Sequence, residues 1–240
     1  MRTTVTFDGV DLTALGFVGE YRAPLLPREI YREQVAGRDG DVFLGVRATA
    51  KKIALRLTVH AQDPAERQRA VRVLAAVLAV DEPKPLVLSI DGGLYHRAIP
   101  TSNADGTRYL NHTSFDVDFE VLDPAAYGET RTVTVPSGGS VTFEVGGTYQ
   151  TMPTVVATQA KNDAFAGRWK LILDGGDYLI ANVASAARLE ADCYARTLKV
   201  AGATRVLELD GDWLVLTPGT HELVMTGTGA ATVTYPERWI

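Results

Sequence analysis

The side chains that most often carry chemistry are sparse and scattered in this sequence. The four histidines, His60, His96, His112 and His221, have no metal-ligand spacing to one another, to a cysteine or to a carboxylate. Cys193 is the only cysteine and has no histidine or lysine nearby, so we expect a buried small residue, not a nucleophile. We therefore expect no enzyme, with no catalytic, metal or cofactor site.

Paired acids and glycine pairs do not change this expectation. Asp174/Asp177 and Asp210/Asp212 flank predicted turns, where aspartate is favoured because its side chain bonds to nearby backbone. The Gly-Gly pairs after residue 130 fall between predicted strands and precede no helix, so they indicate turns and not phosphate-binding loops.

Two tryptophans leave a second function open. An exposed tryptophan on a β-sandwich can stack on a sugar ring, which makes Trp169 and Trp213 candidate glycan-stacking residues. Each of them also heads a run of alternating apolar residues, which favours burial in a core. A carbohydrate-binding module that attaches to host cell-surface glycan is therefore the alternative function.

Charge and hydropathy exclude several classes of partner. The net charge is -5, with 15 basic and 18 acidic residues up to residue 130 and 9 and 11 after it. No basic face appears, so we expect no sequence-specific binding of nucleic acid. No apolar run approaches the roughly 20 residues of a membrane-spanning helix, so we expect no membrane insertion. The polar, alternating start does not resemble a signal peptide, which predicts folding in a cytoplasm.

The first half predicts a β domain with one helix. Residues 52–60 and 115–121 alternate apolar and polar, as half-buried antiparallel strands do. Their outward sides are opposite in charge, Lys52 and Arg56 against Asp116, Asp118 and Glu120. These charges either pair across strands within one sheet or set the register of an interface between copies.

The helix is expected from Asp63 to about Val80. Asp63 is a suitable cap, Pro64 suits the first turn, and two prolines beyond the helix stop it. Its second half, VLAAVLAV, is apolar all round, so it is buried on two sides within the monomer or covered by a neighbouring subunit. We favour a subunit contact through Val73, Val77 and Val80.

The sequence pattern changes after the predicted bend at Asp123 and Pro124. From Arg131 onward short β-type runs recur about every ten residues with glycine-rich turns between them, which is typical of a β-sandwich or jelly roll. We therefore expect a mainly β protein with two domains, a β-sandwich-like domain at 1–129 and a second sandwich at 130–240. Asp123, Pro124 and Tyr127 form the predicted junction.

An extended hairpin arm is predicted in the first domain, within YREQVAGRDGDVFLGV. Gly37 and Gly40 permit a positive φ in its turn, with Arg38 and Asp39 between them. With Val35, these residues are the candidate contact arm toward a neighbouring subunit or another protein. An ordinary surface hairpin would have the same sequence pattern.

An ordered set of sequence pieces resembles the distal tail proteins of siphophages. The pieces are VTFDGVDLTALGFVG, VAGRDGDVF, the strand and helix that follow, FDVDFEVLDPAAYGET, and the terminal VTYPERWI. Ala36 replaces the aliphatic residue or proline usual before Gly-Arg-Asp-Gly. Tyr127 matches the aromatic residue of the family's domain junction.

The resemblance implies a structural role in the tail tip of a siphophage or prophage. It implies a homohexameric ring that joins the major tail tube protein to a tail-associated hub, lysin or tip protein and passes DNA through its lumen. It also implies a galectin-like C-terminal domain that docks receptor-binding proteins in some relatives. The expected location is the virion tail tip, assembled in the bacterial cytoplasm.

Overall fold

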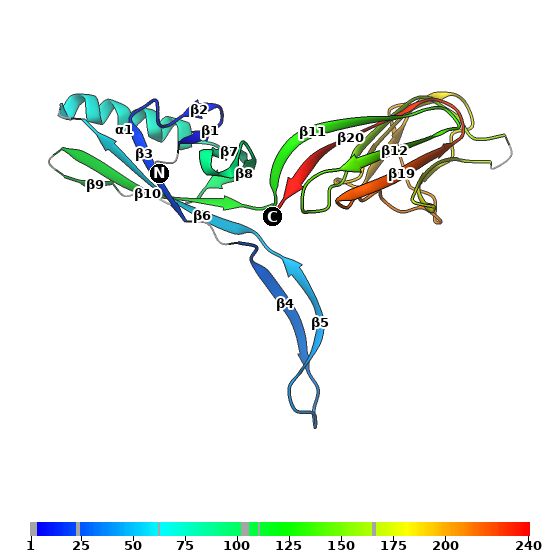
Figure 1. Ribbon diagram of the computed structural model, residues 1–240, viewed down its shortest axis with the longest axis horizontal. Helices are drawn as coiled ribbons and strands as arrows, with labels where there is room; N and C mark the ends of the chain where they lie inside the picture. The colour runs from blue at the N-terminus through cyan, green and yellow to red at the C-terminus, as the bar shows by residue number, and fades with distance from the viewer. Residues whose placement is uncertain (1–3, 23–24, 62, 102–105, 110, 165–166) are drawn as a thin grey trace. The chain divides into compact units, whose positions relative to one another are not determined.

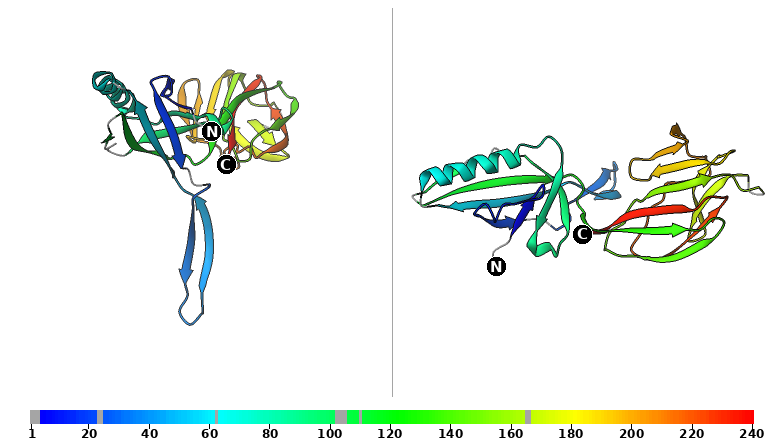
Figure 2. Two further views of the ribbon diagram at one scale, coloured as in Figure 1. Left: turned by 60° about the vertical axis from the view of Figure 1, so that its left-hand side comes forward. Right: turned by 90° about the horizontal axis from the view of Figure 1, so that it is seen from above.

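The chain folds into two compact units. The computed structural model describes residues 4–22, 25–61, 63–101, 106–109, 111–164 and 167–240. Unit 1 reaches Tyr127 and includes Ile240, and unit 2 is Gly128–Trp239. Both units are built mainly from antiparallel strands, and the described residues contain one α-helix (Figures 1 and 2). The predicted mainly β class with a single helix is therefore confirmed.

Unit 1 contains one antiparallel sheet with the strand order β2-β1-β7-β8-β10-β6-β3, and β9 pairs with β10. A short 3₁₀ turn at Ser89–Asp91 and two glycines with positive φ, Gly92 and Gly93, connect β7 to β8. The strands are β1 (Val5–Phe7), β2 (Val10–Asp11), β3 (Phe17–Arg22), β6 (Lys51–His60), β7 (Lys84–Leu88), β8 (Tyr95–Pro100), β9 (Gly106–Arg108) and β10 (His112–Val121).

The core of unit 1 lies on one side of β6 and β10. These strands pair along their whole lengths, and the predicted inward residues are buried on both. They are Ile53, Leu55, Leu57 and Val59 on β6, and Phe115, Val117, Phe119 and Val121 on β10. Because side chains alternate along a strand, the charged residues between them all point to the opposite side, here called the outer face.

Helix α1 (Pro64–Leu78) packs against this core. Asp63 caps it as predicted, because its Oδ1 accepts a hydrogen bond of 2.9 Å from the Ala65 amide. Figure 2 shows the helix lying along the sheet, and Leu74 is its fully buried residue. Val77 and Val80 are partly buried against the monomer core, whereas Val73 is 43% exposed. Of the three predicted interface valines, the monomer therefore leaves Val73 most accessible to a neighbour.

The predicted arm is a separate two-stranded sheet of β4 (Arg28–Gln34) and β5 (Asp41–Ala48). It extends away from the strands of unit 1 in Figure 1, and β5 leads into β6 after two residues. At its tip Gly37 and Gly40 have φ of 80° and 79°, as the turn prediction requires. A bulge opposite Tyr31 and Arg32 interrupts the pairing register.

Unit 2 is a sandwich of two antiparallel sheets, as predicted. One has the order β18-β17-β16-β13-β20-β11 and the other β12-β19-β14-β15. The strands are β11 (Ala126–Val135), β12 (Ser140–Val145), β13 (Thr154–Ala160), β14 (Trp169–Leu173), β15 (Gly176–Ala181), β16 (Ala187–Asp192), β17 (Thr197–Val200), β18 (Ala203–Arg205), β19 (Gly219–Thr226) and β20 (Ala231–Trp239). Buried side chains from both sheets form one core, including Val155, Leu189, Val233, Leu171 and Leu223.

Two predicted strands of the second half are absent. Residues 206–210 form no strand, and residues 213–216 are irregular apart from a single bridge from Leu216 to Thr151. Leu214 and Leu216 are nevertheless fully buried. The alternation in this segment therefore reflects a loop that sends every second side chain into the core, without a neighbouring strand to pair its backbone.

The burial of Trp169 contradicts its candidate role in glycan stacking. Its side chain is 0% exposed within the unit 2 core, so neither face of the indole is open to a sugar ring. Trp213 is partly buried and packs against the same core. Burial in the core is the outcome for Trp169, and Trp213 retains only partial exposure.

We expect Trp169→Ala to lower the free energy of unfolding of unit 2 by about 3–5 kcal/mol, because it removes a fully buried aromatic side chain and leaves a cavity. Trp213→Ala should cost less, since part of that side chain is already in water. Urea unfolding followed by circular dichroism checks both. Equal, small effects of the two substitutions would contradict the assignment of Trp169 to the core.

Candidate functional site

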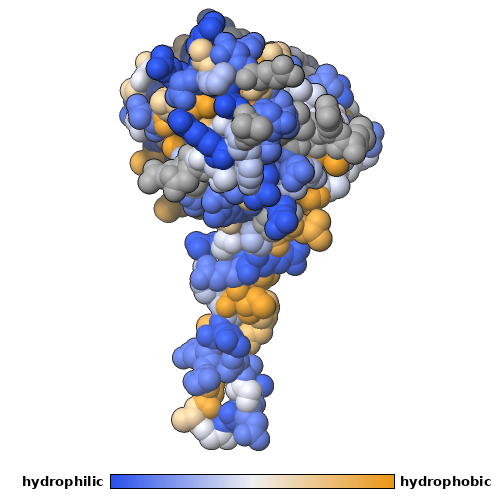
Figure 3. All heavy atoms as spheres, turned by 90° about the vertical axis from the view of Figure 1, so that its left-hand side faces the viewer, coloured by the Kyte–Doolittle hydropathy of each residue, from blue (hydrophilic) through white to orange (hydrophobic). Residues whose placement is uncertain are grey.

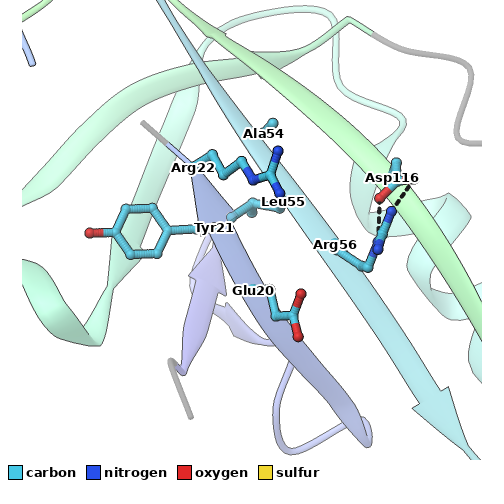
Figure 4. Close-up of a pocket in the computed structure, with 7 residues that line it drawn as sticks. All are labelled: Glu20, Tyr21, Arg22, Ala54, Leu55, Arg56 and Asp116. Atoms are coloured by element: carbon cyan, nitrogen blue, oxygen red, sulfur yellow. Dashed lines mark hydrogen bonds and ion pairs between the residues drawn. The ribbon is translucent and has the colours of Figure 1, made fainter. Parts of the chain in front are cut away.

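The outer face of unit 1 carries a row of alternating charges across three strands. Arg56 on β6 lies opposite Glu20 on β3 and opposite Asp116 on β10. The guanidinium donates two hydrogen bonds to the Asp116 carboxylate, from Nε at 2.8 Å and from Nη2 at 3.1 Å. Figure 4 shows this pair at one edge of a pocket of about 340 Å³, which Tyr21, Arg22, Ala54 and Leu55 also line.

These charges neutralise one another within the sheet. Lys52 reaches Asp118 with an N–O distance of 2.6 Å. The hydrogen bond from Arg56, then its charge, lowers the pKa of Asp116, and the same contact raises the pKa of Arg56. Of the two arrangements expected for these charges, Lys52, Arg56, Asp116 and Asp118 have the pairing within one sheet, and Glu120 is exposed beside them. The row therefore offers a pre-ordered polar surface, with no nucleophile and base in contact among the residues shown in Figure 4.

The arm presents a different surface, because one of its faces carries exposed apolar side chains beside the ion pair of Arg32 and Asp41. Strand alternation and the pairing register place Ile30, Phe43 and Val46 on the same face, where they are 62%, 66% and 51% exposed. Figure 3 shows hydrophobic surface along the projecting arm. An isolated two-stranded hairpin is only marginally stable in water, and contiguous exposed apolar residues mark contact surfaces. We call these three residues the apolar arm face.

The opposite face of the arm is polar and internally bonded. Glu29 accepts hydrogen bonds from Arg47 at 3.0 Å and from the Tyr31 hydroxyl at 3.2 Å. The Arg47 guanidinium also lies over the Tyr31 ring, 5.9 Å from its centroid. Each face therefore has one ion pair, and the faces differ because Ile30, Phe43 and Val46 lie together on only one of them.

The predicted contact residues of the arm lie at its tip. Val35, Gly37, Arg38, Asp39 and Gly40 are all exposed, and the Arg38 amide donates to the Val35 carbonyl at 3.2 Å. Sequence reasoning selected these turn residues and missed the apolar arm face beside them. The apolar residues Ile30, Phe43 and Val46 on the two sides of the predicted turn are the signal that could have found it.

The predicted junction residues form a bonded bend at the end of unit 1. The Tyr127 hydroxyl donates to Asp123 Oδ2 at 2.5 Å, and Asp123 Oδ1 accepts from the Ala125 amide across Pro124. The Tyr127 ring stacks on Tyr95 with centroids 5.3 Å apart. These contacts fix the backbone where the chain leaves β10, and the boundary between the units follows Tyr127.

The histidines are not isolated in space, which corrects the expectation from their spacing. Strand pairing places His60 directly opposite His112, and His96 Nε2 lies 3.2 Å from Asp91 Oδ2. His221 Nδ1 lies 2.6 Å from Asp174 Oδ2. Residues far apart in sequence meet because antiparallel strands fold back on each other. Among the described residues no group of three or more histidine, cysteine or acidic side chains could hold a metal ion.

His96 is the buried titratable group of unit 1. It is 5% exposed, and its Nδ1 has no hydrogen-bond partner among the described residues. Burial, then the charge of Lys51, lowers the pKa of His96 below its ordinary value of 6.5, while Asp91 partly opposes this. Burial likewise lowers the pKa of Lys51, against the raising effects of Asp91 and Asp123. The neutral imidazole is therefore the form that the fold accommodates.

This arrangement predicts that unit 1 loses stability in mild acid. The pKa of His96 is lower in the folded chain than in the unfolded chain, so the unfolded chain binds the proton more readily. The free energy of unfolding should therefore fall as the pH drops below about 6.5 and level off below the folded pKa. Urea unfolding between pH 8 and pH 5 measures this, and His96→Gln should reduce the slope. An unchanged slope in that variant would contradict the assignment.

Two family models match successive parts of the chain. Residues 11–121 match the phage tail protein RIFT-related domain, and residues 146–239 match the C-terminal domain of the siphovirus-type tail component. No curated protein matches the chain significantly. No helix among the described residues is both long and apolar enough to span a membrane.

Solved structures share the fold over the whole chain. The Dit protein (gp 19.1) of phage SPP1, described as a paradigm of the hub adsorption apparatus in phages that infect Gram-positive hosts, has a TM-score of 0.79 and 19% identity, with all of both chains covered. A chain of the activated phage P2 baseplate with Ca has a TM-score of 0.52 and 10% identity, covering 98% of this chain and 97% of that one. With both family models matched in order, the chain belongs to the distal tail proteins of siphophages.

Proposed function

We propose that this protein is the structural hub of a siphophage or prophage tail tip. In this role it forms a homohexameric ring that joins the tail tube to the tip or baseplate proteins and lets DNA pass through its lumen. Membership of the family supports the role in the tail, and the apolar arm face is the observation that carries the proposal of a ring.

The arm needs a partner for physical reasons. Fully burying an apolar side chain of the size of Ile30, Phe43 or Val46 contributes about 1.5–3 kcal/mol, and the single chain leaves all three largely in water. The loss of translational and rotational freedom when the subunits associate offsets part of this gain in free energy. In a closed ring each subunit gives one arm and receives another, so a moderate contact recurs at every interface.

The remaining surfaces fit this role. The paired charges of the outer face would orient a neighbour more than attract it, and a net charge of -5 per chain disfavours adhesion of passing DNA. Val73 on helix α1 is a further accessible position for a contact between subunits. We place the tube protein and a hub, lysin or tip protein on the two sides of the ring, and receptor-binding proteins on the C-terminal unit. Assembly takes place in the host cytoplasm.

The carbohydrate-binding alternative has less support. It depended on two tryptophans able to stack on sugar, and Trp169 is enclosed by the core of unit 2. Trp213 alone, partly buried, provides no pair of stacking platforms. We therefore assign no glycan site, and propose that the protein works by assembly without catalysis.

The oligomeric state tests the proposal directly. Light scattering over a wide concentration range should give a species of about six times the 25.9 kDa chain, alone or after addition of the cognate tube protein. The tube protein alone provides the baseline. A chain that stays monomeric under both conditions would overturn the ring.

The arm can be tested with two matched substitutions on β4. Ile30→Lys should abolish or strongly weaken ring formation, because it places a charge in the apolar arm face. Glu33→Lys adds the same side chain on the opposite face, three residues away, and should leave the ring intact. Light scattering measures assembly, and circular dichroism confirms that both variants fold. Equal assembly by both would show that this face makes no subunit contact.

A further inference from the structure

A pair of histidines lies on the outer face at the end of β6 and β10. His60 and His112 form the last residue pair of the register, and both are in phase with Arg56 and Asp116, four residues away on each strand. Their ring centroids are 5.2 Å apart. His60 is exposed and His112 is partly buried, so solvent reaches the pair. The two residues lie at the end of the fully paired strands β6 and β10.

The surroundings of His112 fix its tautomer. Its Nδ1 lies 2.9 Å from the amide oxygen Oδ1 of Asn111, which can only accept a hydrogen bond, so Nδ1 carries the proton. The lone pair is then on Nε2. Tyr109 stacks on the same ring with centroids 4.2 Å apart and planes inclined by 14°. Metal-binding histidines are oriented in this way, through a hydrogen bond from the nitrogen that does not bind the metal.

The spacing of the two rings suits a shared metal ion. Zinc binds imidazole nitrogen at about 2.0–2.1 Å with a tetrahedral arrangement. Each ring centroid lies about 1.1 Å beyond its nitrogen, so two rings on one tetrahedral zinc have centroids about 5.2 Å apart. The observed centroid separation of 5.2 Å therefore allows the two rings to share one ion when their Nε2 atoms turn toward each other.

We propose that His60 and His112 form a two-histidine site for a divalent transition metal ion of the zinc class. Imidazole ligands favour Zn²⁺, Co²⁺, Ni²⁺ and Cu²⁺ over Mg²⁺ and Ca²⁺. Both histidines bind through Nε2, Asn111 is a positioning residue, and water or a group from another molecule completes the coordination. A bound ion links β6 to β10. It stabilises the folded form of unit 1, because it binds the folded chain and not the unfolded one. The site is independent of the ring proposed above.

Calorimetric titration of the untagged, full-length chain with ZnCl₂ tests the site. We expect one zinc per chain, no binding of MgCl₂, and an affinity at least tenfold weaker in His60→Ala and in His112→Ala. Ser114→Ala, two residues from His112 on the same face, is the matched control and should bind as the wild type does. Failure of the wild type to bind zinc at millimolar concentration, or unchanged binding in the double histidine variant, would overturn the proposal.

Asn111 needs a separate test, because it does not touch the metal. Asn111→Ala should weaken zinc binding by about tenfold, with no change in the melting temperature of the metal-free chain. Asn111→Asp keeps an acceptor for Nδ1 and should restore the affinity. Equal affinity in all three chains would remove Asn111 from the site.

Nuclear magnetic resonance of the histidine side chains identifies the ligands. Zinc should shift the ring resonances of His60 and His112 and leave those of His96 and His221 unchanged, so two histidines of the same chain act as internal controls. Shifts confined to His96 or His221 would overturn the assignment.

Discussion

The pairing of β6 with β10 is the contact on which the rest of unit 1 depends. The two strands are in register over ten residue pairs, from Lys51 opposite Val121 to His60 opposite His112. Because side chains alternate, this one register decides both faces at once. A slip of β6 by one residue would send Ile53 and Leu55 into water and bring Lys52 and Arg56 toward the core. The buried face, the charge row and the histidine pair are therefore consequences of a single alignment.

The same strands support the arm. Strand β5 leads into β6 through only two residues, so the arm is connected directly to one of the two strands of unit 1 that pair along their whole lengths. Lys52 and Arg56 are already paired with Asp118 and Asp116 on the outer face, whereas the apolar side chains of the arm are still exposed to water. In the proposed ring, the buried face of the sheet would stabilise unit 1, whereas apolar side chains of the arm would make the contact between subunits.

Much of this fold could be predicted because it follows from local patterns. Alternation identified β6 and the inward side of β10, Asp63 marked the start of the helix, and Gly37 and Gly40 marked the tip of the arm. Contacts between segments that are distant in the sequence could not be predicted in this way. Residues 213–216 alternate like a strand, yet they lack a full backbone partner, and nothing local distinguishes the two cases. The burial of Trp169 likewise depends on a facing sheet that its own neighbours do not specify.

The histidines show where further inference from sequence was possible. Each one appears isolated when spacing along the chain is the criterion, because metal-ligand spacings describe helices and tight turns and not paired strands. Both strands were recognised from their alternation, however, and pairing Ile53 with Phe119 extends by simple counting to His60 and His112. What the sequence does not supply is the Asn111 contact that fixes the tautomer of His112, since that depends on side-chain geometry. A strand register, once established, is therefore a means of finding side-chain pairs that no linear motif contains.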